Sequence, residues 1–520
     1  MSSLHRLLRP RSVAVIGASA DPTKTTGRPI GYLQRHGFGG AIWPVNPRAT
    51  EIGGLRCFPD VASLPDAPDV AIILVGPERA EAAVRDLAAR GCAAAIVLAG
   101  GYAESGAEGG ARQSALRDAA GEMRLLGPNT IGLVNLADRI VLSASGALEV
   151  EDLAAGSISL VSQSGGILGA VLSRGAAQGI GFARLVSTGN EADLDVADFL
   201  DLFAEDEATR VIAIYVEGLR RPDAFRAAAL KAAAAGKPVV AYKVGRSEAG
   251  ARAAISHTGA LAGADRLYDA LFRQLGIIRA ERFADLLDIP AALASGRRPR
   301  GRRVAVLTST GGAGALLADN LGLAGFDLPP PDEATAARIA ALTGEAAVAN
   351  PLDLTLAGLK PEVLGGSIAA LLESESYDAL AVVVGSSALA QPRLAADAIA
   401  AGQAASEKPV LAYLSPHAPA IGAALQRQGI PAASAPEAIA TMLGALAAPP
   451  TTRSATPAVA PADITLPSGP LDEAESKALF ARFGIPPVRE QACATPAEAA
   501  KAASEIGGRL VLKALSRHLA

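Results

Sequence analysis

The chain has 520 residues, 50% of them hydrophobic, and a formal net charge of -4. This length exceeds what one hydrophobic core serves and predicts three or four domains. The small net charge argues against a nucleic-acid-binding protein, and the one basic run, residues 296–303, is expected to be a solvated linker. Because the sequence has no run of about 20 apolar residues and its start lacks the apolar segment of a signal peptide, we expect a cytoplasmic protein without a membrane span.

Cysteine spacing gives no sign of a disulfide framework or a metal site. Cys57, Cys92 and Cys493 are far apart, and none belongs to a CxxC pair or a Cys/His cluster. The sequence therefore predicts no metal ligands, and buried, inert cysteines are the favoured interpretation.

The first part of the chain has the pattern of a nucleotide-binding sheet. Residues 12–19 form a buried-strand run that ends in a glycine turn, and further strands are expected at residues 41–47, 70–75 and 93–98. A helical pattern at residues 78–90 separates the last two, so the alternation predicts a parallel, doubly wound sheet with ligands at the strand ends. Gly17, Ser19 and Gly27 do not spell GxGxxG, which makes a nicotinamide-dependent dehydrogenase a weaker alternative.

Two later strands turn directly into glycine-rich helix starts. Residues 157–161 are followed by Ser162-Gln-Ser-Gly-Gly166, and residues 303–308 are followed by a similar turn at residues 309–314, so the third domain is expected to repeat the second. Unpaired N–H groups at such helix starts favour a phosphate. An ordinary helix cap remains the alternative for each, and loop capping is the favoured role for Asn350 and Asp353.

A single histidine lies among small residues in Ile255-Ser-His-Thr-Gly-Ala-Leu-Ala-Gly263. Glu217 ends the strand at residues 210–216, and His257 lies in the loop after the strand at residues 238–244. If these strands are neighbours in one sheet, the carboxylate can fix the imidazole tautomer and make the other ring nitrogen a better nucleophile. The alternatives are a satisfied loop histidine at His257 and a solvated strand-end charge at Glu217.

The end of the chain is expected to be a separate segment. Residues 449–470 are rich in Pro, Ala, Thr and Ser and predict a linker. Helices at residues 471–480 and 496–506 and a strand at residues 509–514 follow. About fifty residues cannot bury the apolar surface of these elements, so we expect further chain or a partner to cover it.

Taken together, these motifs resemble those of the nucleoside-diphosphate-forming acyl-CoA synthetases, a family that includes ADP-forming acetate-CoA ligases and is related to succinyl-CoA synthetase. Residues 13–19 and 127–132 match the CoA-binding domain of that family, residues 161–166 and 256–260 its ligase domain, and residues 304–447 its second ligase domain. The resemblance implies an α/β fold. It comprises a Rossmann-like CoA-binding domain (1–140), two flavodoxin-like parallel-sheet ligase domains (150–295 and 302–448), a linker (449–470) and an incomplete ATP-grasp start (471–520).

The resemblance also implies the reaction acid + CoA + ATP ⇌ acyl-CoA + ADP + phosphate, through an acyl phosphate and a phosphohistidine. His257 is implied as the phosphorylated residue and Glu217 as its support. The two helix starts are implied to hold the phosphoryl group through Ser162, Ser164, Gly165, Gly166, Gly311, Gly312 and Gly314. CoA is implied to bind along Gly17, Ala18, Ser19, Pro44, Asn46, Val75, Gly76, Pro77, Gly100 and Asn129.

Lys513 is implied to contact the nucleotide, with Mg²⁺ accompanying ATP or ADP on a missing or partner portion. The implied partners are a small carboxylic acid and an ATP-grasp region or subunit within a homo- or hetero-oligomer. A different class of function, a CoA- or acyl-CoA-binding sensory module without turnover, remains open. An intact His257, Glu217 and both glycine turns count against it, because a pure binder needs none of them.

Overall fold

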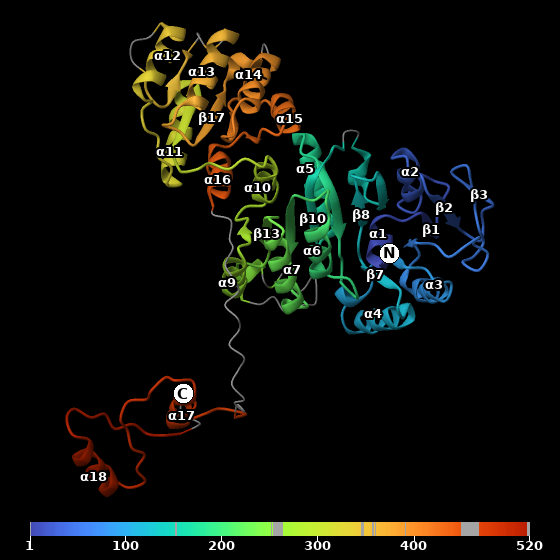
Figure 1. Cartoon of the computed structure of the whole chain (residues 1–520). Helices are drawn as coiled ribbons and strands as arrows, with labels where there is room; N and C mark the ends of the chain where they lie inside the picture. The colour runs from blue at the N-terminus through green and yellow to red at the C-terminus, as the bar shows by residue number, and fades with distance from the viewer. Residues whose placement is uncertain are drawn as a thin grey trace. The chain divides into compact units, whose positions relative to one another are not determined.

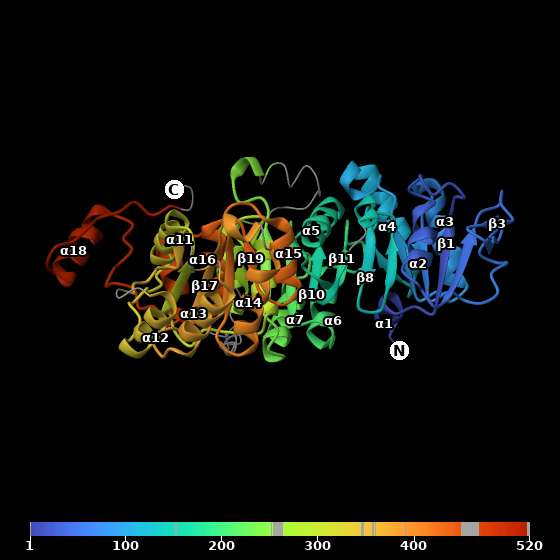
Figure 2. The ribbon, with the colours of Figure 1, turned by 90° about the horizontal axis from the view of Figure 1, so that it is seen from above.

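The computed structural model describes residues 2–150, 153–250, 252, 264–344, 348–355, 358, 360–389, 392–448 and 467–516. The chain divides into two compact units, Met1–Ser454 and Ala455–Ala520, which are described separately. The first unit contains three sheets built mainly from parallel strands, with helices on both faces (Figures 1 and 2). Among the described residues, no helix is both long and apolar enough to cross a bilayer.

The first sheet has the strand order β2-β1-β5-β6-β7, and all neighbouring strands are parallel. Its strands are β1 (Ser12–Ile16), β2 (Ala41–Val45), β5 (Val70–Ile73), β6 (Ala94–Val97) and β7 (Arg124–Leu126). The helices are α1 (Ser3–Leu8), α2 (Arg28–Arg35), α3 (Pro77–Ala89) and α4 (Ala107–Ala120), with a short η1 (Ala103–Ser105) and a small hairpin of β3 (Glu51–Ile52) and β4 (Leu55–Arg56). β5 and β6 are buried along their whole length, which explains their continuous apolar sequence.

The second sheet has the order β14-β13-β12-β10-β11-β8-β9. Its strands are β8 (Gly132–Asn135), β9 (Ile140–Ser143), β10 (Ala155–Ser162), β11 (Phe182–Ser187), β12 (Val211–Val216), β13 (Val239–Lys243) and β14 (Ile278–Arg279). The helices are η2 (Gly146–Glu149), α5 (Gly165–Gln178), α6 (Val196–Glu205), α7 (Pro222–Ala234), α9 (Asp265–Leu275) and α10 (Asp285–Ala294).

β8 and β9 lie close to the boundary expected for the first domain at residue 140. β8 pairs antiparallel with β11, and β9 pairs antiparallel with β8. Both strands are fully buried. This hairpin extends the second sheet at its edge, so residue 140 lies inside that sheet. The sequence did not reveal the hairpin because its place depends on the pairing of β8 with β11, which is distant in the chain.

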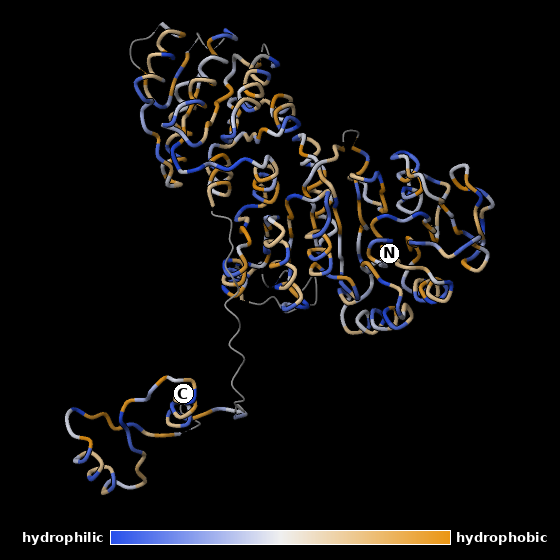
Figure 3. Tube along the Cα trace, in the orientation of Figure 1, coloured by the Kyte–Doolittle hydropathy of each residue, from blue (hydrophilic) through white to orange (hydrophobic). Residues whose placement is uncertain are grey.

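Alternate residues of the second sheet face two different cores. Leu160 and Ala213 pack in one core with residues of α5 and α10, whereas Val161 and Ile214 pack in another with residues of α6 and α7. This alternation follows from the two-residue period of a strand. Figure 3 shows hydrophobic stretches along the central strands and hydrophilic residues along many outer loops.

The third sheet has the order β16-β15-β17-β18-β19, with parallel neighbours throughout. Its strands are β15 (Val304–Thr308), β16 (Leu352–Asp353), β17 (Ala379–Val384), β18 (Val410–Leu414) and β19 (Ala432–Ala433). The helices are α11 (Gly311–Leu323), α12 (Glu333–Thr343), α13 (Pro361–Glu373), η4 (Ser386–Leu389), α14 (Pro392–Ala404), α15 (Pro419–Arg427) and α16 (Pro436–Ala447).

All three sheets share one strand order. When the parallel strands of each are numbered along the chain, the order is 2-1-3-4-5, as in flavodoxin-like folds. The connection after the first strand runs toward one edge of the sheet, and the connection after the third strand runs toward the other edge. This creates a crevice at the carboxyl ends of these two strands, where ligands bind. These switch points lie at β1/β5, β10/β12 and β15/β17. The predicted α/β architecture is confirmed.

The second unit contains two described helices, α17 (Glu473–Arg482) and α18 (Pro496–Ile506). The strand expected at residues 509–514 is irregular, which corrects that prediction. A strand needs a partner for its backbone hydrogen bonds, and the described part of this unit has none. Val511 and Leu512 are 82% and 85% exposed, which fits an apolar sequence with nothing packed on it.

Candidate functional site

Three of the loops predicted to bind CoA meet at the carboxyl edge of the first sheet. Asn46 Nδ2 donates to Ala18 O (2.8 Å) and therefore joins the ends of β1 and β2. Gly17 has a φ of 80°, and a Cβ at this position would lie 2.7 Å from Val75 Cγ1. Glycine is thus required for the close approach of the β1 and β5 turns. Ser19 Oγ accepts from Asp21 N (3.1 Å) and shapes the same loop.

The remaining CoA candidates are divided between this edge and a second group. Gly76 caps α3 and Pro77 is its first residue, while Pro44 pairs with Val15 inside the sheet. Gly100 and Asn129 lie together elsewhere along the edge, since a Cβ at Gly100 would lie 3.4 Å from Asn129 Oδ1.

Asn190, from the turn after β11, links the second group to the second sheet. Its amide accepts from Asn129 Nδ2 (3.2 Å) and donates to the Glu104 carboxylate and to Gln113 Oε1 (3.1 Å). Residues of two sheets therefore meet around Asn129.

The α5 turn uses its hydroxyls to shape the helix start. Ser162 Oγ donates to Ser164 O (2.7 Å) and accepts from Ser164 N (3.2 Å), and Ser164 Oγ caps Ile167 N (3.4 Å). Gly165 is half-buried and Gly166 is exposed. The Ser164 hydroxyl therefore caps α5 and the Ser162 hydroxyl shapes the turn before it, while the N–H groups at the helix start favour an anion.

The α11 turn repeats this arrangement without the cap. Thr308 Oγ1 donates to Thr310 O (3.0 Å) and accepts from Thr310 N (2.9 Å), but the Thr310 side chain makes no capping bond. Gly311 and Gly312 are exposed, and Gly314 packs against Thr308. Among the described residues, no hydrogen bond or ion pair joins this turn to the α5 turn.

Asp353 lies beside the α11 turn and has the loop role expected for it, whereas Asn350 bonds the backbone of β15 instead of capping a loop. The Asn350 amide donates to Val304 O (2.9 Å) and accepts from Val306 N (2.9 Å). Asp353 accepts from Thr355 N (2.9 Å).

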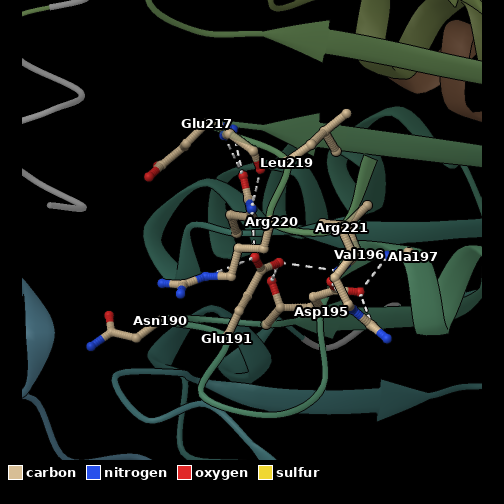
Figure 4. Close-up of polar contacts among 12 residues, drawn as sticks. Asn190, Glu191, Asp195, Val196, Ala197, Glu217, Leu219, Arg220 and Arg221 are labelled. Carbon is tan, nitrogen blue, oxygen red and sulfur yellow. Dashed lines mark hydrogen bonds and ion pairs between the residues drawn. The ribbon is translucent and has the colours of Figure 1, made fainter. Parts of the chain in front are cut away.

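Glu217 lies at the switch point of the second sheet, directly after β12. β12 and β13 are parallel neighbours, as the interpretation of Glu217 and His257 requires. Glu217 is 9% exposed, and Figure 4 shows its carboxylate directed away from the hydrogen bonds of its backbone. His257 lies outside the described residues, so its distance from Glu217 stays a prediction.

Two residues that sequence reasoning did not select lie beside Glu217. The Gln163 side chain spans from the α5 turn to the Glu217–Gly218 backbone, and its amide also donates to Glu191 Oε2 (2.9 Å). Glu191 follows β11 in the polar sequence Thr-Gly-Asn-Glu. A polar cluster directly after a buried strand was the available signal, because such clusters gather at the carboxyl edge of a parallel sheet.

Burial dominates the electrostatics of Glu191. Burial, reinforced by the nearby Asp195 charge, raises the pKa of Glu191 from 4.5 to about 7 despite donors from Gln163 and Thr188. Asp195 is itself paired with Arg221, whose Nε lies 2.7 Å from Oδ2 (Figure 4).

A second buried charge ends the neighbouring strand. Lys243 ends β13, is fully buried and lies 4.7 Å from the centre of the Tyr268 ring. Burial lowers the pKa of its ammonium group. Charged groups with shifted pKa values thus surround the end of β12.

Lys513 belongs to the second unit and is exposed. Its Nζ lies 2.7 Å from Glu473 Oε1 at the start of α17. Among the described residues, no group of three or more His, Cys, Asp and Glu side chains is arranged to hold a metal ion. We therefore assign no described residue to Mg²⁺.

Three segments match known domain families. Residues 11–135 match the CoA binding domain, residues 155–293 match the succinyl-CoA ligase like flavodoxin domain, and residues 467–520 match an ATP-grasp domain. Together with the three switch-point sheets, these matches define a CoA-dependent ligase of the succinyl-CoA ligase type.

Similar proteins identify the family. The alpha subunit of ADP-forming acetate-CoA ligase II from Pyrococcus furiosus is 33% identical over 455 residues, which cover 85% of this chain and 97% of that protein. A solved structure of dinucleotide-forming acetyl-coenzyme A synthetase 1 from Ca. Korarchaeum cryptofilum, in complex with phosphate and ADP, is 34% identical. Its TM-score is 0.78, and the match covers 86% of this chain and 96% of that chain. The chain belongs to the nucleoside-diphosphate-forming acyl-CoA synthetase family, which includes the ADP-forming acetate-CoA ligases.

The relatives differ in length. The chain covers nearly the whole of the Pyrococcus alpha subunit. By contrast, it spans about half of ADP-forming acetate-CoA ligase I from Archaeoglobus fulgidus, which is 35% identical over 384 residues covering 73% of this chain and 55% of that protein.

Proposed function

We propose that this chain carries the CoA-binding and phosphoryl-transfer parts of an enzyme that catalyses acid + CoA + ATP ⇌ acyl-CoA + ADP + phosphate. In the forward direction, a His257 ring nitrogen takes the γ-phosphoryl group and ADP leaves. The carboxylate of the acid then takes the phosphoryl group from His257 and becomes an acyl phosphate. Finally, the CoA thiol attacks the acyl carbonyl, the C–O bond to phosphate breaks, and inorganic phosphate is released with the thiol proton passing to solvent.

The position of Glu217 carries this proposal. It lies at the β10/β12 switch point, beside the glycine-rich start of α5, in the segment that matches the succinyl-CoA ligase like domain. From there the carboxylate accepts the N–H of the His257 imidazole, which leaves the other ring nitrogen free to attack phosphorus. The N–H groups at the α5 and α11 starts stabilise the phosphoryl charge.

The CoA-binding role is supported by the close packing of the first switch point. A Cβ at Gly17 would collide with the Val75 side chain, so a glycine at this position lets the β1 and β5 turns approach each other at the carboxyl edge. We propose domain boundaries that differ from the sequence expectation at one place: the CoA-binding domain ends near residue 131, and the ligase domain begins with β8 at Gly132.

The nucleotide half-reaction requires an ATP-grasp region. Residues 467–520 match the family of that domain, and we propose that Lys513 contacts the nucleotide there, with Mg²⁺ bound to the nucleotide. The Pyrococcus relative is named an alpha subunit, so a hetero-oligomer is one arrangement that supplies the region. The acid is a small carboxylic acid whose identity is left to assay.

The central step is tested with the full chain and radiolabelled acetyl phosphate as the phosphoryl donor. We expect label that survives alkali and is lost in acid, which is the signature of phosphohistidine. His257→Asn should abolish it while CoA binding, measured by calorimetry, stays unchanged. CoA binding without any labelling would instead favour the sensory module, and labelling of the His257→Asn variant would overturn the assignment of that residue.

A further inference from the structure

The Gln163 side chain forms hydrogen bonds to the backbone directly after β12, beside the point where the neighbouring strand β10 ends. β10 ends at Ser162, where the chain turns into α5. The backbone N–H and C=O groups that follow β12 therefore have no strand beside them on the β10 side. The Gln163 side chain takes that place. Its Oε1 accepts from Glu217 N (2.5 Å) and Gly218 N (3.0 Å), and its Nε2 donates to Gly218 O (2.7 Å). One side chain thus holds the turn that carries Glu217.

Glu191 determines which way round the Gln163 amide lies. The second Nε2 hydrogen is donated to Glu191 Oε2 (2.9 Å), and Arg220 Nε lies 3.6 Å from the same oxygen. The other oxygen accepts from Thr188 Oγ1 (2.9 Å) and Val196 N (3.1 Å). These groups are all donors, so an amide turned by 180° would aim its oxygen at the carboxylate and its NH2 group at two N–H groups.

The placement of Glu191 is costly for an ordinary turn residue. Its carboxylate is buried, and its φ of 56° lies in the left-handed region that non-glycine residues seldom adopt. Burying a carboxylate and straining the backbone both cost free energy, and such features persist where the surroundings over-determine them. An exposed polar residue would serve a simple turn equally well.

We propose that Gln163 and Glu191 are positioning residues for Glu217. Glu191 holds the Gln163 amide in the single orientation that binds both N–H groups of the Glu217–Gly218 turn, and this fixes the direction in which the Glu217 carboxylate leaves the sheet. The proposal rests on the proposed function, in which that carboxylate orients His257. Neither positioning residue touches the reacting atoms.

The experiment measures the initial rate of His257 phosphorylation by radiolabelled acetyl phosphate in the full chain. Glu191→Gln and Gln163→Glu each break the donor–acceptor match without changing side-chain size, and each should lower the rate at least about tenfold. CoA affinity should stay unchanged, because the side-chain hydrogen bonds of both residues go to groups other than the CoA candidates. The matched control is Asp288→Asn in α10, another buried carboxyl group with a raised pKa, which should retain the wild-type rate.

The double variant Gln163→Glu/Glu191→Gln distinguishes positioning from general destabilisation. In the double variant the pair again consists of one carboxylate and one amide. The amide is now at position 191, where its oxygen can accept from Thr188 and Val196. The double variant should therefore be faster than Gln163→Glu alone, in which two carboxylates face each other. If the two single losses simply multiply, the residues act independently and the proposal is wrong.

Failure of this proposal can be told apart from failure of the proposed function. If the wild-type chain takes up no label on His257, the proposed function fails. If the wild type is labelled and both single variants label at the wild-type rate, only the positioning role fails. Should either single variant not fold, Thr188→Val removes one donor to Glu191 with little change in shape. A fall of about threefold is then expected, and an unchanged rate overturns the proposal.

Discussion

In the second sheet, the hydroxyl at the end of the first strand, Ser162, holds the backbone of the residue two positions later. In the third sheet, Thr308 makes the same pair of bonds to Thr310. Both strands end at a switch point, and both turns lead into a helix that begins Gly-Gly. The two domains therefore share a hydroxyl–glycine turn that local sequence specifies.

The residues beside the two turns are different. Gln163 and Glu217 in the second sheet correspond to Ser309 and Gly385 in the third, by their positions after the first and third strands. A Cβ at Gly385 would lie 2.5 Å from Thr310 Oγ1, so the third domain has no room for a carboxylate there. The comparison teaches that the fold and its glycine-rich turn are repeated, whereas the acid that we propose serves His257 has no counterpart at the equivalent position of the third domain.

The sharpest test of this difference replaces Glu217 and Gly385 in two separate variants. Glu217→Gln keeps the size of the side chain but removes the charge that we propose orients His257, so the phosphorylation rate should fall by roughly 100-fold or more. Gly385→Ala should instead lower the thermal midpoint, because its methyl group collides with Thr310. Both are measured with labelled acetyl phosphate and differential scanning fluorimetry. A wild-type labelling rate in Glu217→Gln would remove the distinction between the domains.

Local patterns in the sequence were enough to predict the turns that the second and third domains share. Ser162 to Gly166 and Thr310 to Gly314 were recognisable because a buried strand, a hydroxyl and glycines follow one another directly. Glu217 was recognisable for a similar reason, since it ends a strand of six buried residues. The pairing of β12 with β13 meets the condition on which the interpretation of Glu217 depended.

The sequence could not predict which residue lies beside Glu217. Gln163 contacts Glu217 across 54 residues, and Glu191 contacts Gln163 across 28, because β10 lies between β11 and β12 in the sheet. That adjacency depends on the strand order, which local patterns do not contain. The same limit explains the β8–β9 hairpin, whose place is set by its pairing with β11.

The two domains should also differ in how pH affects stability. The folded pKa of Glu191, about 7, lies above its ordinary value of 4.5. Between these values the folded state holds more protons than the unfolded state, so stability falls as pH rises from 4.5 to 7 and levels off above 7. In the third domain, hydrogen bonds from the Ser374 hydroxyl and from Thr335 hold the pKa of Asp332 well below its usual range. Asp332 is therefore ionised in both states above pH 5.

Thermal midpoints of matched variants between pH 5 and pH 8 measure this contrast. The stability of the wild type relative to Glu191→Gln should decrease by up to about 3 kcal/mol over this interval, which corresponds to a pKa difference of roughly 2.5. Relative to Asp332→Asn it should stay constant. Parallel curves for the wild type and Glu191→Gln would mean that the Glu191 carboxyl group has an ordinary pKa in the folded protein.

The smallest expected difference concerns the two helix caps. Ser164 Oγ accepts from Ile167 N at the start of α5, whereas Thr310 makes no such bond at the start of α11. Ser164→Ala should therefore cost about 1 kcal/mol of stability, and Thr310→Ala should cost clearly less. Thermal midpoints at one pH, measured without phosphate so that anion binding does not contribute, give both values. Equal losses would show that Thr310 also stabilises its helix start, and the two turns would then differ only in Gln163 and Glu217.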